Sequence, residues 1–301
     1  MKWPRRKGDY IELRDKLTIY NANKKLSGLV SDAALDTFVT QIIASQRRED
    51  YYRLVQNKEI GPDRANPNHS LFDPERAVAH HLQSGRMDEA CWLMFLMTHF
   101  ARHAKSEWRR LSDVYGMLVE GTLSWKKFAR NPAKYIQWLE QNWEKVGGAF
   151  GNHRKYESLN PEKNRSTNKV LLAYYELIGK DHANYFDSLQ LGTVNDPFDV
   201  LYRNFKVLTF GRLAKFDFLM LLARYGVLEI TPRSAYLATA TGPKKGAKLL
   251  FANDQDANIT NAALQGKLDD LDEVLAIGME VLEDAICNWQ KSPEKFIHFT
   301  G

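Results

Sequence analysis

The chain has 301 residues, of which 44% are hydrophobic, 12% aromatic and 26% charged. This composition excludes a disordered or low-complexity protein, and the length is sufficient for one large domain or two small ones. The net charge of +5 is compatible with a polyanionic partner but identifies none by itself. The two cysteines, Cys91 and Cys287, form no Cys-x-x-Cys pair, so we expect reduced packing residues in a cytosolic protein.

The N-terminal segment MKWPRRKGDY (1–10) is basic and lacks the apolar run of a signal peptide, so none is predicted. The most apolar stretch, CWLMFLMTHF (91–100), is too short to cross a bilayer. His99 and His103 stand four residues apart, a spacing that suits a metal if both lie on one helix face. No acidic third ligand is identifiable nearby, so we predict neither a metal nor a cofactor.

Hydrophobic periodicity predicts an all-α fold, because no convincing two-residue alternation occurs. Residues 31–48 begin with the N-cap candidates Ser31 and Asp32 and continue with apolar residues at helical spacing. A long basic loop is predicted over 147–167. We expect a single helical unit over 1–301, with two lobes divided near 150–165 as the alternative. Further helices are predicted at 75–84, 87–103, 106–118, 131–145, 168–179, 183–190, 197–208, 212–225 and 268–290.

Residues 232–252 are predicted to form a helix, a hairpin and a second helix. RSAYLATA fits a short helix started by a proline, TGPKKG fits a turn, and AKLLFA begins the next helix. Gly242 and Gly246 permit a close approach of the backbone to another group. Free N–H groups at the helix start, together with Lys244 and Lys245, favour an anion such as a phosphate. The alternative is a plain turn between two helices with solvated lysines.

The order of elements around this segment resembles the helix-hairpin-helix DNA glycosylases. The amphipathic stretch FGRLAKFDFLMLLARYG (210–226) precedes the hairpin, and GAK (246–248) stands where the glycosylase hairpin ends in Gly-x-Lys. The two glycines are further apart here than in that motif. The resemblance implies an all-α, helix-hairpin-helix DNA glycosylase-like fold, with the hairpin gripping DNA phosphates.

Longer segments resemble one bacterial family, α-glutamyl/putrescinyl thymine pyrophosphorylase clade 3. They are residues 71–103, FGNHRKYESL (150–159), FGRLAKFDFLMLLARYG (210–226), YLATATGPKKGAKLLF (236–251) and VLEDAICNWQKSPEKF (281–296). The resemblance implies base chemistry on DNA, which requires flipping the base out of the stack. We expect a glycosylase that excises a bulky modified pyrimidine, such as glucosylated hydroxymethylcytosine, from phage DNA in antiviral defence. The alternatives are a transferase that builds hypermodified thymine and a non-enzymatic DNA-binding module.

Breaking an N-glycosidic bond creates positive charge on the sugar, which a neighbouring carboxylate stabilises. The resemblance places this carboxylate after the hairpin, and we favour Asp284, although it stands further from the hairpin than is usual. An N-capping or helix-surface carboxylate is the alternative for Asp284. Asp269 or Asp270, at a predicted helix start, is the alternative. Glu157 is predicted as a second carboxylate. Lys248 matches the Schiff-base lysine of bifunctional glycosylases, with a phosphate contact or a solvated surface position as its alternative.

The loop GNHRKYESL concentrates charge, an aromatic ring and glycine in one place, which favours recognition of a flipped base over a merely solvated loop. Trp289 has a core position as its alternative, and Asp217 is an alternative carboxylate. The residues expected to contact the base are His153, Arg154, Lys155, Tyr156, Asn288 and Trp289. The residues expected to contact the DNA backbone are Gly242, Lys244, Lys245, Gly246, Arg212 and Lys215.

Overall fold

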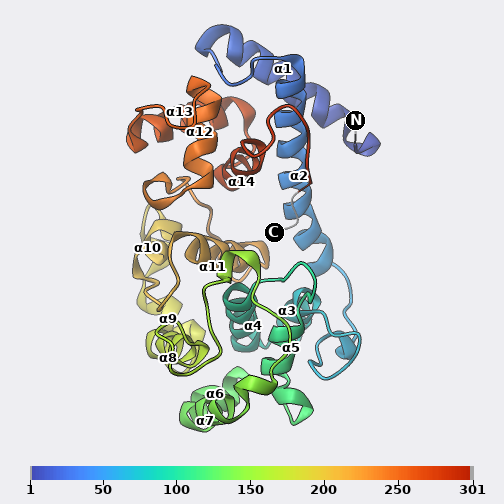
Figure 1. The fold of residues 1–301 in the computed structure, drawn as a ribbon, viewed down its shortest axis with the longest axis vertical. Helices are drawn as coiled ribbons and strands as arrows, with labels where there is room; N and C mark the ends of the chain where they lie inside the picture. The colour runs from blue at the N-terminus through green and yellow to red at the C-terminus, as the bar shows by residue number, and fades with distance from the viewer. Residues whose placement is uncertain (1, 299–301) are drawn as a thin grey trace. The chain divides into compact units, whose positions relative to one another are not determined.

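The computed structural model describes residues 2–298 and confirms the all-α class: these residues form helices and no β-strand. Figure 1 labels the α-helices in chain order. Short 3-10 helices connect them, including η5 (Asn152–Arg154) and η7 (Leu237–Thr239). The α-helices are α1 (Lys7–Lys24), α2 (Asp32–Gln56), α3 (Pro74–Gln83), α4 (Met87–Phe100), α5 (Arg109–Tyr115), α6 (Trp125–Arg130), α7 (Pro132–Asn142), α8 (Thr167–Ile178), α9 (His182–Ser188), α10 (Pro197–Asn204), α11 (Arg212–Arg224), α12 (Gly242–Ala252), α13 (Asn261–Leu275) and α14 (Met279–Trp289).

The chain divides into two compact units, and the division does not fall near residues 150–165. Unit 1 is formed by the two ends of the chain, up to Tyr51 and from Thr231 onward. Unit 2 is the continuous stretch from Tyr52 to Ile230. Each unit has its own buried core.

Unit 1 is held together by the apolar faces of α1, α2, α12, α13 and α14 (Figure 1). On α13, Leu264, Leu268, Leu271 and Leu275 recur at three and four residues, and each is at most 2% exposed. Burying a leucine side chain contributes roughly 1.5–3 kcal/mol, so this stripe fixes one face of α13 against the core. Trp289, at the end of α14, is fully buried.

Two glycines allow α12 to approach α14 closely. A β-carbon on Gly246 would lie closer than 3.0 Å to the carbonyl oxygen of Ile286. A β-carbon on Gly242 would lie 2.6 Å from the Sγ of Cys287. A larger residue at Gly246 would therefore push the two helices apart, since it meets backbone, whereas one at Gly242 would have to displace the Cys287 side chain. Both glycines of α12 face α14, and the absence of a side chain there lets the two helices pack closely.

The predicted helix and turn before α12 are wrong. RSAYLATA forms no α-helix, and only the 3-10 turn η7 is helical within it. TGPKKG is no free turn, because α12 begins at Gly242 with Pro243 in its first turn. A proline fits there, since its missing N–H would have no partner in a first helical turn. The structure therefore lacks the first α-helix of the expected hairpin.

The predicted helix 268–290 is interrupted and forms the end of α13 and the whole of α14. Ala276 has a φ of 53° and Gly278 a φ of 90°, so the backbone leaves the helical region between them. The Asp272 carboxylate holds this turn, because its Oδ1 accepts hydrogen bonds from the N–H groups of Ile277 at 3.2 Å and Gly278 at 2.9 Å. Helical spacing continues across the turn, which is why the sequence pattern does not reveal it.

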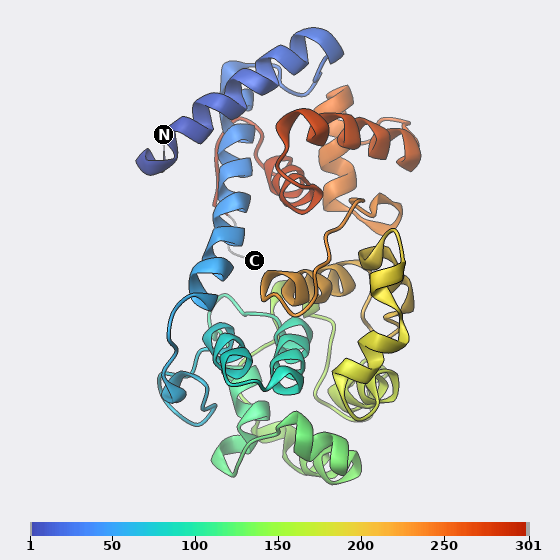
Figure 2. The same ribbon diagram turned by 180° about the vertical axis from the view of Figure 1, so that it is seen from behind.

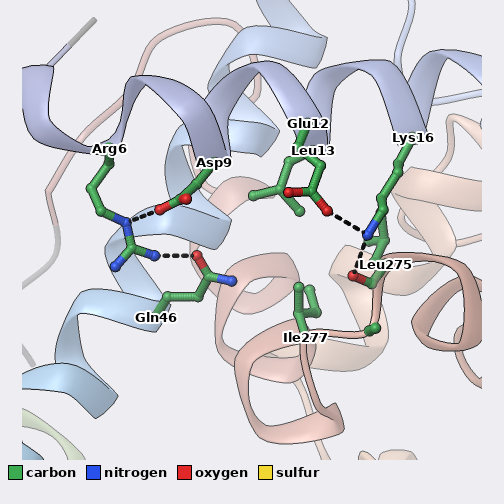
Figure 3. A pocket seen from close by; sticks show the side chains of 9 residues that line it. Arg6, Asp9, Glu12, Leu13, Lys16, Gln46, Leu275 and Ile277 are labelled. Carbon is green, nitrogen blue, oxygen red and sulfur yellow. Dashed lines mark hydrogen bonds and ion pairs between the residues drawn. The ribbon is translucent and has the colours of Figure 1, made fainter.

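Helix α1 was not predicted, because its buried stripe is narrow and consists of Leu13, Leu17 and Tyr20. Figure 3 shows how α1 is fastened to unit 1 along a shallow pocket. Arg6 donates to Gln46 Oε1 of α2 at 2.7 Å. Lys16 pairs with Glu12 at 2.8 Å and donates to the carbonyl oxygen of Leu275 at 3.4 Å. These contacts join the N-terminal segment to both α2 and the end of α13.

Unit 2 is built around α4, which is buried from Ala90 to Phe100 and packs against α3 and α11 (Figures 1 and 2). Its side chains meet a cluster of aromatic rings, in which Phe95 stacks on Tyr174 with centroids 3.7 Å apart. The ring centroid of Trp92 lies 5.0 Å from that of Phe128. Such ring pairs add roughly 0.5–1.5 kcal/mol each beyond their burial.

Helix α4 ends three residues before the predicted boundary. Ala101 has a φ of 50°, which stops the helix after Phe100. His103 therefore lies outside the helix, and His99 and His103 do not share a helix face. Within residues 2–298, no group of three or more metal-ligating side chains gathers, and no helix is both long and apolar enough to cross a membrane.

Candidate functional site

Asp284 is the centre of a polar cluster between α14 and the part of α2 that belongs to unit 1. Its Oδ2 accepts a hydrogen bond from the Ser45 hydroxyl at 2.5 Å. Its Oδ1 accepts from Arg48 Nη1 at 2.7 Å and from Asn288 Nδ2 at 3.0 Å. The side chain is 23% exposed, so the carboxylate is oriented by protein donors and still reached by solvent. Ser45, Arg48 and Asn288 all donate to the carboxylate, and the hydrogen bond from Arg48 is charge-assisted.

The chemistry of the neighbours fixes the orientation of Asn288. A carboxylate accepts only, and an ammonium group donates only, so the amide must present nitrogen to Asp284 and oxygen to Lys291. Lys291 Nζ accordingly donates to Asn288 Oδ1 at 2.9 Å. Asn288 is 8% exposed. Both the nitrogen and the oxygen of its amide therefore bond to protein side chains, Asp284 and Lys291. This arrangement differs from the predicted contact of Asn288 with a base.

The start of α12 is a second feature of unit 1. No side-chain hydrogen bond caps this helix and no acidic residue lies in its first turn, so no side chain there balances the positive end of the helix dipole. Lys244 and Lys248 are one turn apart, and together with Lys245 they lie on the side of the helix that solvent reaches. Within residues 2–298, none of these lysines forms an ion pair. This helix start is suited to an anion.

The two features are joined through α14. The first turn of α12 meets Cys287, and Cys287 is three residues, less than one helical turn, from Asp284. Since Asp284 faces α2 and Cys287 faces α12, the carboxylate and the lysine-rich helix start lie on neighbouring faces of one helix. Unit 1 therefore brings together a hydrogen-bonded anion and a candidate phosphate site.

The other predicted carboxylates of unit 1 lie on the surface. Asp270 pairs with Lys24 at 2.8 Å and is half exposed. Asp269 accepts from Gln265 Nε2 at 2.6 Å. Both stand in the middle of α13, away from a helix start, which removes the reason for preferring them. Trp289 was predicted to contact the base or to lie in the core. It is fully buried against Phe38 and presents no ring face to a base.

In unit 2, the loop 150–159 points its predicted residues in opposite directions. His153, Lys155 and Tyr156 are exposed, and Tyr156 is 73% exposed. Arg154, by contrast, is 5% exposed. The short helix η5 turns the chain so that Arg154 and Glu157, three residues apart, are buried, while the two residues between them are exposed. Only the exposed three are available to a ligand in this conformation.

Arg154 fastens the loop to the end of α4. Its Nε donates to the carbonyl oxygen of His99 at 3.2 Å, and its Nη1 and Nη2 donate to the carbonyl and hydroxyl oxygens of Thr209 at 2.9 Å. A cation at a helix C-terminus satisfies carbonyls that have no helical partner. Burial lowers the pKa of Arg154, while Glu157 and Asp217 act to raise it. This arginine is therefore a structural link, and its predicted contact with a base would require the loop to open.

Burial keeps His99 neutral and selects its tautomer. The pKa of His99 is held well below its usual value, first by burial and then by Arg154 and Arg165. Its Nδ1 lies 3.4 Å from Arg154 Nη2, a donor, so this nitrogen carries the lone pair. Its Nε2 then carries the proton and donates to Thr167 Oγ1 at 3.0 Å. His99 is thus a satisfied core histidine.

The side chain of Glu157 is fully buried in unit 2. Asp284, the other carboxylate predicted to be catalytic, belongs to unit 1. Glu157 Oε1 accepts from Arg165 and lies 3.6 Å from Arg154 Nη2. Its Oε2 has no hydrogen-bond donor among the described residues. A carboxylate with no exposed atom holds these arginines in place, and it reaches a substrate only if the loop moves.

Helix α11 of unit 2 contains the remaining predicted residues, which are partly buried. Lys215 Nζ lies 5.4 Å above the ring of Tyr202, and burial followed by the charge of Lys206 lowers the pKa of Lys215. The Arg212 guanidinium lies 4.8 Å from the ring of Phe216. Both cations lie against aromatic rings and are partly buried, a geometry compatible with a phosphate contact.

Sequence reasoning missed Ser45 and Arg48, the α2 residues that order Asp284. Together with Gln41, which is 3% exposed, they recur on one face of α2 at spacings of four and three. Polar residues repeated on one face of a buried helix indicate a buried polar partner. That pattern was the available signal, but it does not name Asp284 as the partner.

The structure therefore defines an all-α protein in which an ordered, partly exposed carboxylate adjoins a lysine-rich helix start. The chain belongs to the alpha-glutamyl/putrescinyl thymine pyrophosphorylase clade 3 family, whose family model matches residues 33–301. This match confirms the family resemblance of the sequence. No curated protein and no solved structure matches the chain.

Proposed function

We propose that the protein is an enzyme acting on a modified pyrimidine in DNA, and specifically a DNA glycosylase that releases the base from phage DNA. The principal support is the geometry of Asp284, a carboxylate held by Ser45, Arg48 and Asn288 beside the lysine-rich start of α12. An anion fixed next to a phosphate site is what cleavage of a nucleotide at its sugar carbon requires. The family description, which names a modified thymine, supports the class of substrate.

In the proposed reaction, the bond between C1′ and the base nitrogen breaks and its electron pair leaves with the base. The Asp284 carboxylate stabilises the positive charge that develops on the sugar. A water molecule forms the new bond to C1′; Asp284 accepts one of its protons, which is then passed to the departing base or to solvent. Arg48 and Ser45 hold the carboxylate in position, so little reorganisation is needed as the charge develops. No covalent enzyme intermediate is required, which leaves Lys248 as a phosphate contact.

The proposal assigns DNA binding to exposed cations and an exposed ring. Lys244 and Lys245 would hold phosphates at the N-terminus of α12, where the helix dipole adds to their charge. In unit 2, Tyr156 offers an exposed ring, with Lys155 Nζ 5.2 Å from its centre, on which a base can stack. His153 is also exposed in this loop and is a further candidate for contact with DNA.

A second candidate function follows from the family description, which specifies a pyrophosphorylase. In that reaction a nucleophile would displace pyrophosphate from an activated 5-methyl group of the pyrimidine, and the glycosidic bond would stay intact. The start of α12, with Lys244, Lys245 and Lys248, would then hold the leaving pyrophosphate. A polyphosphate suits this arrangement as well as a DNA backbone does.

Mass spectrometry of DNA incubated with the protein separates the two functions. A glycosylase releases free modified base and leaves abasic sites, which are cleaved by alkali. A transferase produces a new nucleoside. We expect free base from glucosylated or hypermodified DNA, no product with Asp284→Asn, and full activity with Asp269→Asn, an exposed carboxylate of the same unit. A new nucleoside in place of free base would favour the second function, and DNA binding without any product would reduce the protein to a binding module.

A further inference from the structure

The N-terminal and C-terminal segments meet in a cluster of cations and aromatic rings in unit 1. Trp3 and Phe296 pack edge to face, with ring centroids 5.6 Å apart. Lys2 Nζ lies 4.6 Å from the centre of the Phe296 ring and 5.6 Å from that of Trp3. The Arg47 guanidinium, from α2, lies 5.0 Å from the Trp3 ring. We call these residues, together with His298, the terminal clasp.

The clasp adjoins the Asp284 cluster through α2. Gln41 Nε2 donates to the carbonyl oxygen of Ile297 at 3.0 Å, which fixes the C-terminal segment against the polar face of that helix. The same face presents Ser45 and Arg48 to Asp284. The C-terminal segment and the candidate catalytic carboxylate therefore share one face of one helix.

Positive charge in the clasp is not neutralised by nearby carboxylates. Among residues 2–298, neither Lys2 nor Arg47 forms an ion pair, and both are exposed. The pKa of His298 is lowered, first by burial and then by the charges of Lys2, Arg48 and Arg47. The aromatic rings contact Lys2 and Arg47 but do not neutralise their positive charge. Gathering like charges this way is unfavourable unless an anion binds there.

We propose that the terminal clasp binds the phosphodiester backbone of DNA beside the nucleotide on which Asp284 acts, an inference that rests on the proposed function. Three observations point to a strand and not to a single small anion. The cations come from both ends of the chain and from α2, so they form a surface and no closed pocket. Trp3 and Phe296 offer flat rings beside the charges, as in sites that follow a nucleic-acid strand. Arg48 joins this surface to the candidate catalytic carboxylate.

The clasp would complete the grip on the substrate strand. The start of α12 contacts α14, the helix that carries Asp284. The clasp contacts α2, which holds Asp284 through Ser45. Each would therefore hold phosphates near Asp284. A bound phosphate would also stabilise the charged form of His298 and raise its pKa. Binding should accordingly take up protons and become tighter as the pH falls through the range in which His298 titrates.

The test is the salt dependence of binding to a fluorescein-labelled duplex, measured by anisotropy with the full-length Lys2→Gln/Arg47→Gln variant. Each lost phosphate contact lowers the slope of log affinity against log salt by about 0.9, so we expect a slope smaller by about 1.8 and binding at least roughly tenfold weaker near 0.1 M salt. The charge-preserving Lys2→Arg/Arg47→Lys variant should keep the wild-type slope. Lys134→Gln removes an exposed lysine that lies 6.0 Å from the Tyr135 ring in unit 2, and it should change neither quantity.

An unchanged slope in the double variant, with its fold intact by circular dichroism, would overturn the inference whether or not the protein releases a base. A reduced slope with no base release by the wild-type protein would support the clasp as a DNA surface and refute the glycosylase. Nuclear magnetic resonance of His298 gives an independent readout, since its pKa should rise on adding the duplex. A pKa that stays constant at saturating DNA would contradict the proposed contact.

Discussion

Replacing Gly246 by alanine tests whether the glycines of GPKKG serve helix packing. In an exposed helix interior, alanine is more favourable than glycine by about 1 kcal/mol, so propensity alone predicts a gain. Gly246 is buried, however, and its new β-carbon would lie within 3.0 Å of the Ile286 carbonyl oxygen, a backbone atom that has little room to move. Overpacking of this kind costs roughly 1–3 kcal/mol, which outweighs the propensity term. We expect unit 1 to lose about 1–2 kcal/mol of unfolding free energy.

Gly266 provides the matched control within the same unit. It lies inside α13, and a β-carbon added at this position would have nothing within 4 Å, so Gly266→Ala should gain up to about 1 kcal/mol. Urea unfolding followed by circular dichroism, with hydrogen exchange of α12 and α14 amides, measures the two changes and localises the loss. If Gly246→Ala proves as stable as the wild type, or if both variants gain stability, the close packing of α12 on α14 is refuted.

Three further predictions follow from individual contacts. Ser45→Ala removes one donor to Asp284, and single-turnover base release should slow about tenfold with unchanged DNA affinity, because a hydrogen bond to a charged group is worth roughly 1.5 kcal/mol or more. Burial, with smaller contributions from neighbouring cations, lowers the pKa of His81 to about 3, so only the unfolded chain takes up its proton between pH 6.5 and 3. From about pH 6.5 to 4.5 the wild type should lose about 2.3 kcal/mol more stability than His81→Gln in urea titrations; equal losses would contradict this. Lys244→Gln/Lys245→Gln should reduce the salt slope of DNA binding by about 1.8 at unchanged single-turnover rate, and an unchanged slope would exclude a phosphate site there.

The sequence predicted the fold class and most helices because their apolar residues recur at helical spacing, as in α2 and α11. It missed α1, whose buried stripe has few residues, and the break at Ala276, where helical spacing runs on across a turn. It also placed a turn at Gly242, where glycine and proline usually mark one. The structure uses the same glycine to pack α12 against α14, and a single sequence cannot distinguish these two uses of a glycine.

At the candidate site, sequence resemblance indicated Asp284 but not its environment. Ser45 and Arg48 stand about 240 positions earlier in the chain, and no local pattern links residues that far apart. Within the loop 150–159, composition suggested a single function, whereas the backbone turn directs Arg154 inward and Tyr156 outward. Burial of that kind depends on tertiary packing, so the residue types alone do not predict it.

The most direct test of the central claim is a structure of the protein bound to duplex DNA that contains a stable abasic-site analogue. If Asp284 stabilises the sugar cation, its carboxylate should be the nearest carboxylate to C1′, at about 3.5 Å or through one water. The lysines at the start of α12 should contact phosphates on the same strand. A sugar that lies beside another carboxylate, such as Asp217 or Asp269, with Asp284 still enclosed by Ser45 and Arg48, would contradict the account.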